Sequence, residues 1–209
     1  MKTVVVSVGG SVLCSDRFDA EYTMQLLKTL NTYCDKKTNI ALVCGGGTTA
    51  RKYIADCKQY LNATELDHIG IAVTNVHAQC VHSLGLSMRL DMKRFTVVGG
   101  TSPGHSTDYV AVEIAQKMKA NIVINISNIA MIYTKHPKNK DAKPCPVLSW
   151  NELQKIVGNT FHGGDHVPFD PYAIQRAKKA KLMGIFLDND IQKLIAFLKY
   201  QTVQGTIVL

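Results

Sequence analysis

The chain has 209 residues, of which 46% are apolar and 19% are charged. This is the composition of an ordinary soluble globular protein, and we expect one domain that spans residues 1–209. No apolar run is long enough to cross a membrane, and the first residues lack a signal-peptide cleavage pattern. We therefore expect a cytoplasmic protein without a membrane partner.

Basic residues outnumber acidic residues by 24 to 16, which gives a formal net charge of +8. The lysines are dispersed along the chain and are concentrated only at 135–143 and 176–181. Neither segment is interleaved with aromatic residues as in nucleic-acid-binding motifs, and the second is typical of a solvated helix face. The charge therefore favours a phosphorylated small molecule over nucleic acid as the acidic partner.

Four short runs rich in valine and isoleucine predict strands that are buried on both faces, at residues 3–8, 40–43, 96–98 and 122–126. The longer segments between them have helical periodicity. In 111–118, for example, the apolar residues Ala111, Ile114, Ala115 and Met118 fall on one face of a helix. This alternation predicts an α/β fold with a mainly parallel sheet covered by helices.

Glycine-rich stretches follow three of these strands, at residues 8–11, 44–47 and 99–104. Ligands of parallel sheets bind beyond the carboxyl ends of the strands, where exposed backbone N–H groups can converge on an anion. The first stretch, Gly9-Gly10-Ser11, is compatible with a tight turn. A tight turn needs only one glycine, however, and the second glycine and the hydroxyl favour a phosphate contact.

The second stretch is Gly45 to Gly47 followed by Thr48, which we expect to start a helix. Arg51 lies about one turn along that helix, where it can add charged donors to the free N–H groups of the helix N-terminus. Arg51 alone would be an ordinary surface residue of an amphipathic helix. Together with the glycines, it indicates an anion-binding site.

The third stretch, Gly99 to Asp108, combines glycines, hydroxyls and a carboxylate at a strand-to-helix junction. Thr107 or Asp108 is a candidate N-cap. The number of donors exceeds what capping needs, so Asp108 is also a candidate for orienting cationic groups or a metal ion beside a transferring phosphoryl group. His105 is either an exposed hydrogen-bonding residue of the turn or a substrate contact.

The sequence contains neither of the two commonest glycine fingerprints for mononucleotides and dinucleotides. His162 and His166 lie in a glycine-rich loop without helical context, which is a weak signal for a metal site. The six cysteines are scattered without metal-type spacing, and we interpret them as reduced structural residues. We therefore predict no metal site formed by protein side chains alone.

The glycine stretches belong to a larger pattern by which the chain resembles the amino-acid kinase superfamily, and within it the archaeal-type uridylate (UMP) kinases. Five blocks in the same order carry the resemblance over nearly the whole chain: residues 8–13, 45–53, 67–71, 99–108 and 170–173. The resemblance implies a three-layer α/β/α sandwich and the reaction of ATP and UMP to ADP and UDP with Mg²⁺. It also implies small-molecule nucleotides as partners and a homo-oligomer, a hexamer or a dimer, although a hetero-oligomer is possible.

The resemblance also implies roles for individual residues. Asp108 and Arg51 match catalytic positions. The UMP side matches Gly46, Asp67, Thr101, Ser102, Pro103, Gly104, His105, Ser106 and Thr107. The positions on the ATP side are Gly9, Gly10, Ser11, Gly47, Arg51, Ser127, Tyr133 and His136, the last of which differs from the family residue.

The chain departs from the family pattern in three places. Ser7 stands where many superfamily members have lysine, although archaeal-type UMP kinases resemble this chain there. In the loop after the fourth strand, Ala130, Met131 and His136 replace the family's Asp, Gly and Asp. The segment 85–95 is about a dozen residues shorter than the family pattern.

These observations leave three hypotheses. The first is a UMP kinase, in which the segment 101–107 holds the acceptor phosphate. The second keeps phosphoryl transfer but changes the acceptor to another small phosphate or amine. The third is a non-catalytic relative that binds a nucleotide or an oxyanion for regulation or storage, and the altered residues 130, 131 and 136 motivate it.

Overall fold

The computed structural model describes residues 3–160 and 167–209. In this part of the chain the strands form one seven-stranded sheet in the order β3-β2-β1-β4-β6-β7-β5. All neighbouring strands are parallel except β6 and β7, which are antiparallel. The strands are β1 (Thr3–Val8), β2 (Asn39–Cys44), β3 (Phe95–Val98), β4 (Ile122–Ser127), β5 (Val147–Leu148), β6 (Met183–Asp188) and β7 (Thr206–Val208).

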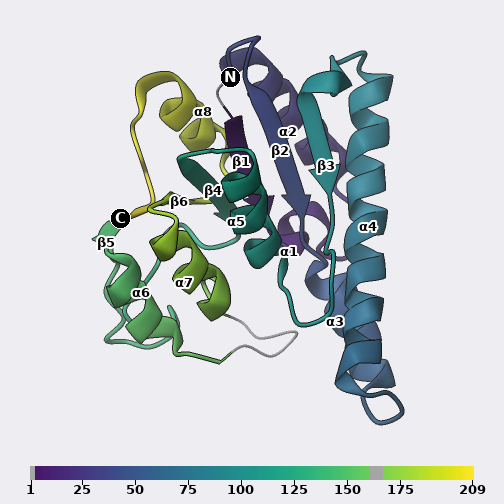
Figure 1. Cartoon of the computed structure of the whole chain (residues 1–209), viewed down its shortest axis with the longest axis vertical. Helices are drawn as coiled ribbons and strands as arrows, with labels where there is room; N and C mark the ends of the chain where they lie inside the picture. Colours follow the sequence, from purple (N-terminus) through teal and green to yellow (C-terminus); the bar gives the residue numbers. More distant parts are fainter. Residues whose placement is uncertain (1–2, 161–166) are drawn as a thin grey trace.

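Helices cover both faces of the sheet. One layer contains α5 (Thr107–Lys117), α6 (Trp150–Val157) and α7 (Pro171–Lys179), and the other contains α2 (Ala20–Tyr33), α4 (Ala63–Ser87) and α8 (Ile191–Tyr200). In Figure 1 the long helix α4 runs beside the edge strand β3. Two further helices, α1 (Gly10–Leu13) and α3 (Gly47–Cys57), follow β1 and β2 directly. The fold is the expected three-layer α/β/α sandwich.

The four predicted strands are confirmed within one residue at each end. The predicted helices at 111–118 and after Thr48 are also confirmed, as parts of α5 and α3. After α4 the chain needs only a short link, with the 3-10 helix η1 (Met92–Arg94), to enter β3. Within the described residues, none of the helices combines the length and the apolar character that a membrane span requires.

The sheet separates two apolar cores, and neighbouring residues of β1 show this directly. Val5 and Val6 are both fully buried, but Val5 packs in the core beneath α5 to α7, and Val6 packs in the core beneath α2, α4 and α8. Successive side chains of a strand point to opposite faces, so a strand buried on both sides must be apolar throughout. This explains why the predicted strands read as continuous valine and isoleucine runs.

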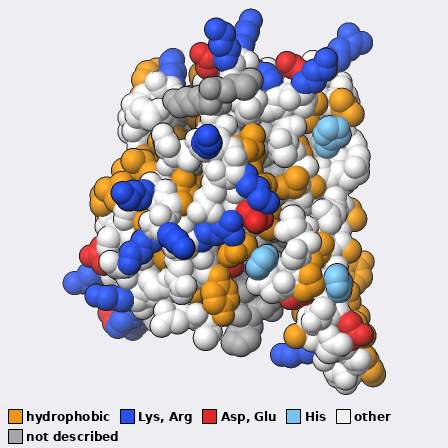
Figure 2. Space-filling view, viewed as in Figure 1, with side chains coloured by type: hydrophobic (Ala, Val, Ile, Leu, Met, Phe, Trp, Pro, Cys, Tyr) orange, Lys and Arg blue, Asp and Glu red, His pale blue; other side chains and the backbone are white. Residues whose placement is uncertain are grey.

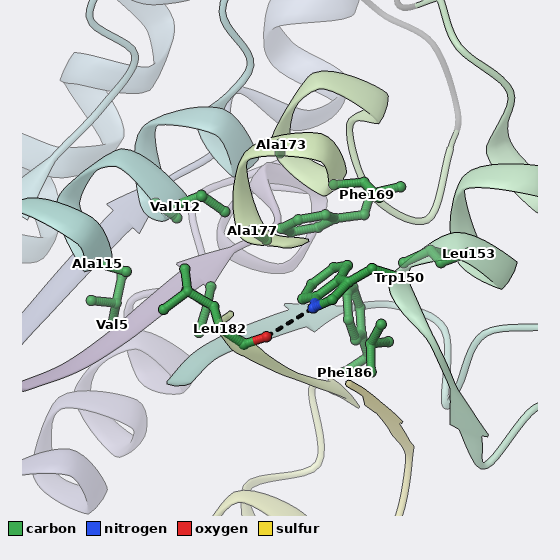
Figure 3. Packing of buried hydrophobic residues seen from close by; sticks show 14 of the residues in the cluster. Val5, Val112, Ala115, Trp150, Leu153, Phe169, Ala173, Ala177, Leu182 and Phe186 are labelled. Atoms are coloured by element: carbon green, nitrogen blue, oxygen red, sulfur yellow. Dashed lines mark hydrogen bonds between the residues drawn. The ribbon is translucent and has the colours of Figure 1, made fainter. Parts of the chain in front are cut away.

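Aromatic residues fill the part of the first core beneath α6 and α7 (Figure 3). The rings of Phe169 and Phe186 meet edge to face with their centroids 5.2 Å apart. Trp150 lies 6.0 Å from Phe169, and its indole Nε1 donates a hydrogen bond of 2.8 Å to the Leu182 carbonyl. This bond satisfies the one polar atom of a side chain that is otherwise buried among apolar groups.

The first two glycine stretches pack against each other, backbone to backbone. A Cβ atom on Gly10 would lie 2.0 Å from the backbone nitrogen of Gly47. A Cβ atom on Gly47 would lie 2.2 Å from the carbonyl carbon of Gly10, and Gly47 also has a φ of +58°. Both positions therefore require glycine, because no side chain fits between the two loops.

We expect Gly47→Ala to lower the free energy of unfolding by at least about 3 kcal/mol, since backbone strain and a steric clash act together. Gly104→Ala is the matched control, because Gly104 has a φ of +78° but open space around its Cα. It should cost only about 1–2 kcal/mol. Urea unfolding measures both variants, and equal losses would contradict the importance of the contact between the loops.

Candidate active site

A cavity of about 600 Å³ lies at the carboxyl edge of the sheet, beyond the ends of β1, β2 and β4. Residues from all three glycine-rich stretches line it. Of the residues expected in the site, those that line the cavity are Gly9, Gly10, Ser11, Gly46, Gly47, Arg51, Asp67, Ser102, His105, Ser106, Thr107, Asp108 and Ser127. The fold therefore brings together most of the residues that the sequence singled out.

Arg51 binds the hydroxyl groups at the start of two helices. Its Nη2 atom donates to Ser11 Oγ at 2.9 Å and to Thr48 Oγ1 at 3.3 Å. Ser11 belongs to α1 and Thr48 to α3, so the guanidinium bridges the loops after β1 and β2. Desolvation lowers the pKa of Arg51 from its ordinary value. The cation and the free N–H groups of α3 together form a positive rim on the cavity.

Asp108 faces the strands rather than capping its own helix. Its Oδ1 atom accepts hydrogen bonds from Ser7 Oγ and from Asn125 Nδ2, each at 3.0 Å. The N-cap of α5 is Ser106, whose hydroxyl accepts from the Tyr109 N–H group at 3.1 Å. The capping alternative for Asp108 and Thr107 is therefore wrong, and the Asp108 carboxylate is held on the cavity wall.

Burial raises the pKa of the Asp108 carboxyl to about 7, and the nearby Asp170 raises it as well. The hydrogen bonds from Ser7 and Asn125 lower it, but burial is the larger effect. A carboxyl group whose pKa lies this close to neutral pH populates both its protonated and its ionised form at pH 7. Such perturbed pKa values are common in functional sites.

Asp170 is 1% exposed and connects two helices at the site. Its Oδ1 atom caps α7 by accepting from the N–H groups of Tyr172 and Ala173, at 2.7 Å and 3.4 Å. Its Oδ2 atom accepts a hydrogen bond from the hydroxyl of Ser106, the cap of α5. Asp170 thus fixes the start of α5, which carries Asp108, relative to α7.

Three of these polar groups are not identified as site residues by the sequence pattern. Asn125 is buried inside an apolar strand, and Ser7 was noted only as a substitution for lysine. Asp170 entered only as part of a matching Asp-Pro block. The signal that identifies them is a polar residue in a run that is otherwise apolar, because such a residue needs a partner at the strand end.

The loop after β3, which the family resemblance predicts to contact UMP, is attached to helix α4. The Gly104 N–H donates to Asp67 Oδ2 at 2.6 Å, and the Gly100 N–H donates to Thr74 Oγ1 at 2.6 Å. Both acceptors belong to α4. Thr101 lines a neighbouring hollow between α4 and β3, and Pro103 and Gly104 lie in the loop without lining the cavity. Asp67 therefore positions this loop as well as facing the cavity.

The remaining candidate ATP contacts belong to the segment after β4 and lie in different places. Ser127 lines the cavity, whereas Tyr133 forms a β-bridge with Pro144 and is not part of the cavity lining. His136 is exposed, and its Nδ1 atom accepts from the Lys138 N–H at 3.3 Å. Two of the three expected contacts of this loop thus lie away from the cavity.

Among the described residues, no group of three or more His, Cys, Asp and Glu side chains is arranged to hold a metal ion. The loop with His162 and His166 lies outside the described residues. Mg²⁺ in phosphoryl-transfer sites is usually held by one or two carboxylates and the substrate phosphates. Asp108 and Asp67 both line the cavity, and the Asp108 carboxylate, at the ends of β1 and β4, would fit this arrangement.

Comparison with known proteins agrees with this geometry. A model of the amino acid kinase family matches residues 86–187. The uridylate kinase of Thermoplasma volcanium is 32% identical to this chain, and the match covers 92% of this chain and 91% of that protein. The uridylate kinase of Pyrococcus abyssi is 34% identical, and the match covers 81% of this chain and 83% of that protein. The crystal structure of uridylate kinase from Archaeoglobus fulgidus superposes with a TM-score of 0.81 at 28% identity, over 100% of both chains.

The mainly parallel three-layer sandwich is the fold that this chain shares with the uridylate kinase of Archaeoglobus fulgidus. The chain belongs to the amino acid kinase family. Within that family it groups with the uridylate kinases of archaea.

The raised pKa of Asp108 predicts how stability changes with pH. In the unfolded chain this carboxyl loses its proton near pH 4, but in the folded protein it keeps the proton until about pH 7. Between these values the folded state binds more protons than the unfolded state, so this group makes the free energy of unfolding fall as pH rises.

We expect Asp108→Asn to lack this decrease, which amounts to at most about 4 kcal/mol between pH 4 and pH 7. Urea unfolding of both proteins across this range measures the difference, and the other titrating groups cancel in the comparison. Parallel pH profiles would mean that the Asp108 carboxyl titrates normally in the folded protein.

Proposed function

We propose that this protein transfers the γ-phosphoryl group of ATP to UMP, giving ADP and UDP. The main support is the similarity to archaeal uridylate kinases over nearly the whole chain, together with a cavity that combines Arg51, Asp108 and the glycine loops. We also propose that Mg²⁺ accompanies ATP and that the nucleotides are the physiological partners of the site.

The chemistry of a nucleoside monophosphate as the phosphoryl acceptor explains which groups the site contains. A nucleoside monophosphate is already largely ionised at pH 7, so its attacking oxygen does not need a general base. The transition state instead spreads negative charge over the transferring group, and the protein contributes positioning and positive potential. Arg51 and the N-terminal N–H groups of α3 supply that potential on the donor side, next to Gly10 and Gly47.

Asp108 then has an organising role. Its carboxylate holds the Ser7 hydroxyl and the Asn125 amide at the ends of β1 and β4, where the phosphoryl group would pass between donor and acceptor. Mg²⁺ bound with ATP would neutralise phosphate charge, and Asp108 would be a protein ligand for it. Asp170 keeps this arrangement in place through Ser106.

Purified protein with Mg²⁺ and ATP should form UDP from UMP faster than it forms diphosphates from CMP, AMP or GMP. A coupled assay for ADP formation measures all four. If turnover occurs only with another acceptor, the specificity is wrong but the reaction class stands. Absence of turnover with every monophosphate would instead support a binding protein for a nucleotide or an oxyanion.

Arg51→Ala should reduce kcat/KM about 10- to 100-fold, since a hydrogen bond between charged groups contributes roughly 1.5–3 kcal/mol. We expect a loss in ATP binding or turnover and little change in UMP binding. Lys52→Ala is the control, because Lys52 follows Arg51 on the same helix and is exposed. Calorimetry separates the two nucleotides, and unchanged ATP binding with intact turnover would make Arg51 an ordinary surface residue.

The altered loop after β4 predicts weakened ATP binding. Ala130 and Met131 are half-buried beside Ile129, which lines the cavity. The triple variant Ala130→Asp, Met131→Gly and His136→Asp restores the family residues and should tighten ATP binding about fivefold or more. ATP is titrated into both proteins. Tight binding to the wild type, unaffected by the substitutions, would show that the loop has not diverged in function.

A further inference from the structure

Tyr109 forms an aromatic contact at the acceptor end of the cavity that the proposed mechanism does not use. The rings of Tyr109 and His105 are stacked, with centroids 4.0 Å apart and an interplanar angle of 22°. Tyr109 lies in the first turn of α5, while His105 lies in the loop before it and lines the cavity. A helix residue is therefore in direct contact with a candidate substrate contact.

Arg176 of α7 contacts both the ring and the hydroxyl group of Tyr109. Its guanidinium lies 5.0 Å from the centre of the tyrosine ring, and its Nη1 atom donates to the Tyr109 hydroxyl at 2.6 Å. Arg176 itself is fixed by a hydrogen bond to Gln116 and by an ion pair of 3.7 Å with Glu113. All of these partners belong to α5, so Arg176 joins α7 to α5.

The surroundings of Arg176 set it apart from the other cations of this surface. Figure 2 shows Lys and Arg side chains spread over the face where α5 and α7 lie. Lys117, the other cation paired with Glu113, is 69% exposed, whereas Arg176 is 28% exposed and contacts three side chains, Tyr109, Gln116 and Glu113. Arg176 is thus a fixed element of the structure, not a mobile surface charge.

The loop needs such a support. His105 is exposed, and its backbone N–H is bonded only within the loop, to the Ser102 carbonyl at 3.2 Å. The flanking loop residue Gly104 is attached to Asp67, and Ser106 is attached to Asp170. These bonds fix the backbone on both sides of His105 but leave its ring free to rotate. The stack with Tyr109 removes that freedom.

We infer that Tyr109 is a positioning residue that holds the His105 imidazole toward the nucleoside monophosphate, and that Arg176 in turn fixes Tyr109. This inference rests on the proposed function for the identity of the acceptor. The stack itself is a property of the protein and is measurable without catalysis. Pre-ordering a ring that contacts substrate reduces the entropy lost on binding, so the stack strengthens acceptor binding and not the chemical step.

Tyr109→Ala should raise KM for UMP about five- to tenfold, the range expected for loss of one aromatic pair, while kcat changes less than about twofold. Tyr109→Phe keeps the stack but loses the bond to Arg176, and should have a smaller effect. Lys117→Ala is the matched control, because it removes the other partner of Glu113 without touching the stack. It should leave both kinetic constants unchanged.

A double-mutant cycle distinguishes positioning from a general loss of structure. If Tyr109 acts through His105, the double variant Tyr109→Ala, His105→Ala has the KM of His105→Ala alone. Independent, multiplying effects on KM would overturn the inference. A decrease in kcat of Tyr109→Ala as large as the increase in its KM would also overturn the inference.

The stack is tested separately by NMR of the histidine ring protons. In the wild type the His105 signals, assigned with His105→Ala, should be displaced by the tyrosine ring current, and Tyr109→Ala should remove the displacement. If the shift is absent in the wild type, the inference fails whatever the activity. If the shift is present but no monophosphate is phosphorylated, the proposed function fails, and calorimetry with UMP replaces KM as the test of acceptor binding.

Discussion

The contact between the loops after β1 and β2 determines the shape of the whole site. Gly10 and Gly47 approach so closely that neither position can carry a side chain. This approach brings the start of α1 beside the start of α3, and Arg51 can then reach Ser11 across the join. This part of the cavity is therefore built from two backbone segments and one cation. Under the proposed function, the phosphates of ATP would approach backbone N–H groups there without bulky side chains in between.

A second constraint acts at the wall of the cavity that is formed by the start of α5 and the ends of β1 and β4. Buried carboxylates, not glycines, determine the structure of this wall. Asp170 is buried at the junction of α5 and α7, and Asp108 is buried against β1 and β4. Removing a carboxylate from water is costly unless hydrogen bonds replace the hydration. Each one accepts hydrogen bonds from hydroxyl, amide or backbone donors and fixes the position of those donors, although for Asp108 these bonds offset only part of the cost of burial. The hydrogen bonds that the polar groups of this wall form also hold those groups in place.

The sequence predicts four strands of the sheet and the edge at which the glycine-rich loops meet, because both depend on strong local patterns, but it does not identify β6. Runs of valine and isoleucine identify the strands, and topology alone places the following loops at one edge. The partners of Asp108 were not predictable, since Ser7 and Asn125 lie 101 and 17 residues away along the chain. Strands of two or three residues, such as β5 and β7, carry no usable periodicity. The loop after β4 has no repeating pattern either, and the positions of Tyr133 and His136 outside the cavity lining depend on tertiary contacts.

Strand β7 lies between β6 and β5, although β5 precedes both of them in the chain. The Thr206 hydroxyl donates to the Cys145 carbonyl at 2.7 Å and accepts from the Ile132 N–H at 2.9 Å, so β7 also anchors the loop after β4. During synthesis on the ribosome, residues 129–148 emerge well before the segment that holds them. Most of the edge formed by the glycine-rich loops can thus form early, while the wall after β4 stays incomplete until β7 pairs. A nascent chain therefore completes this side of the cavity last.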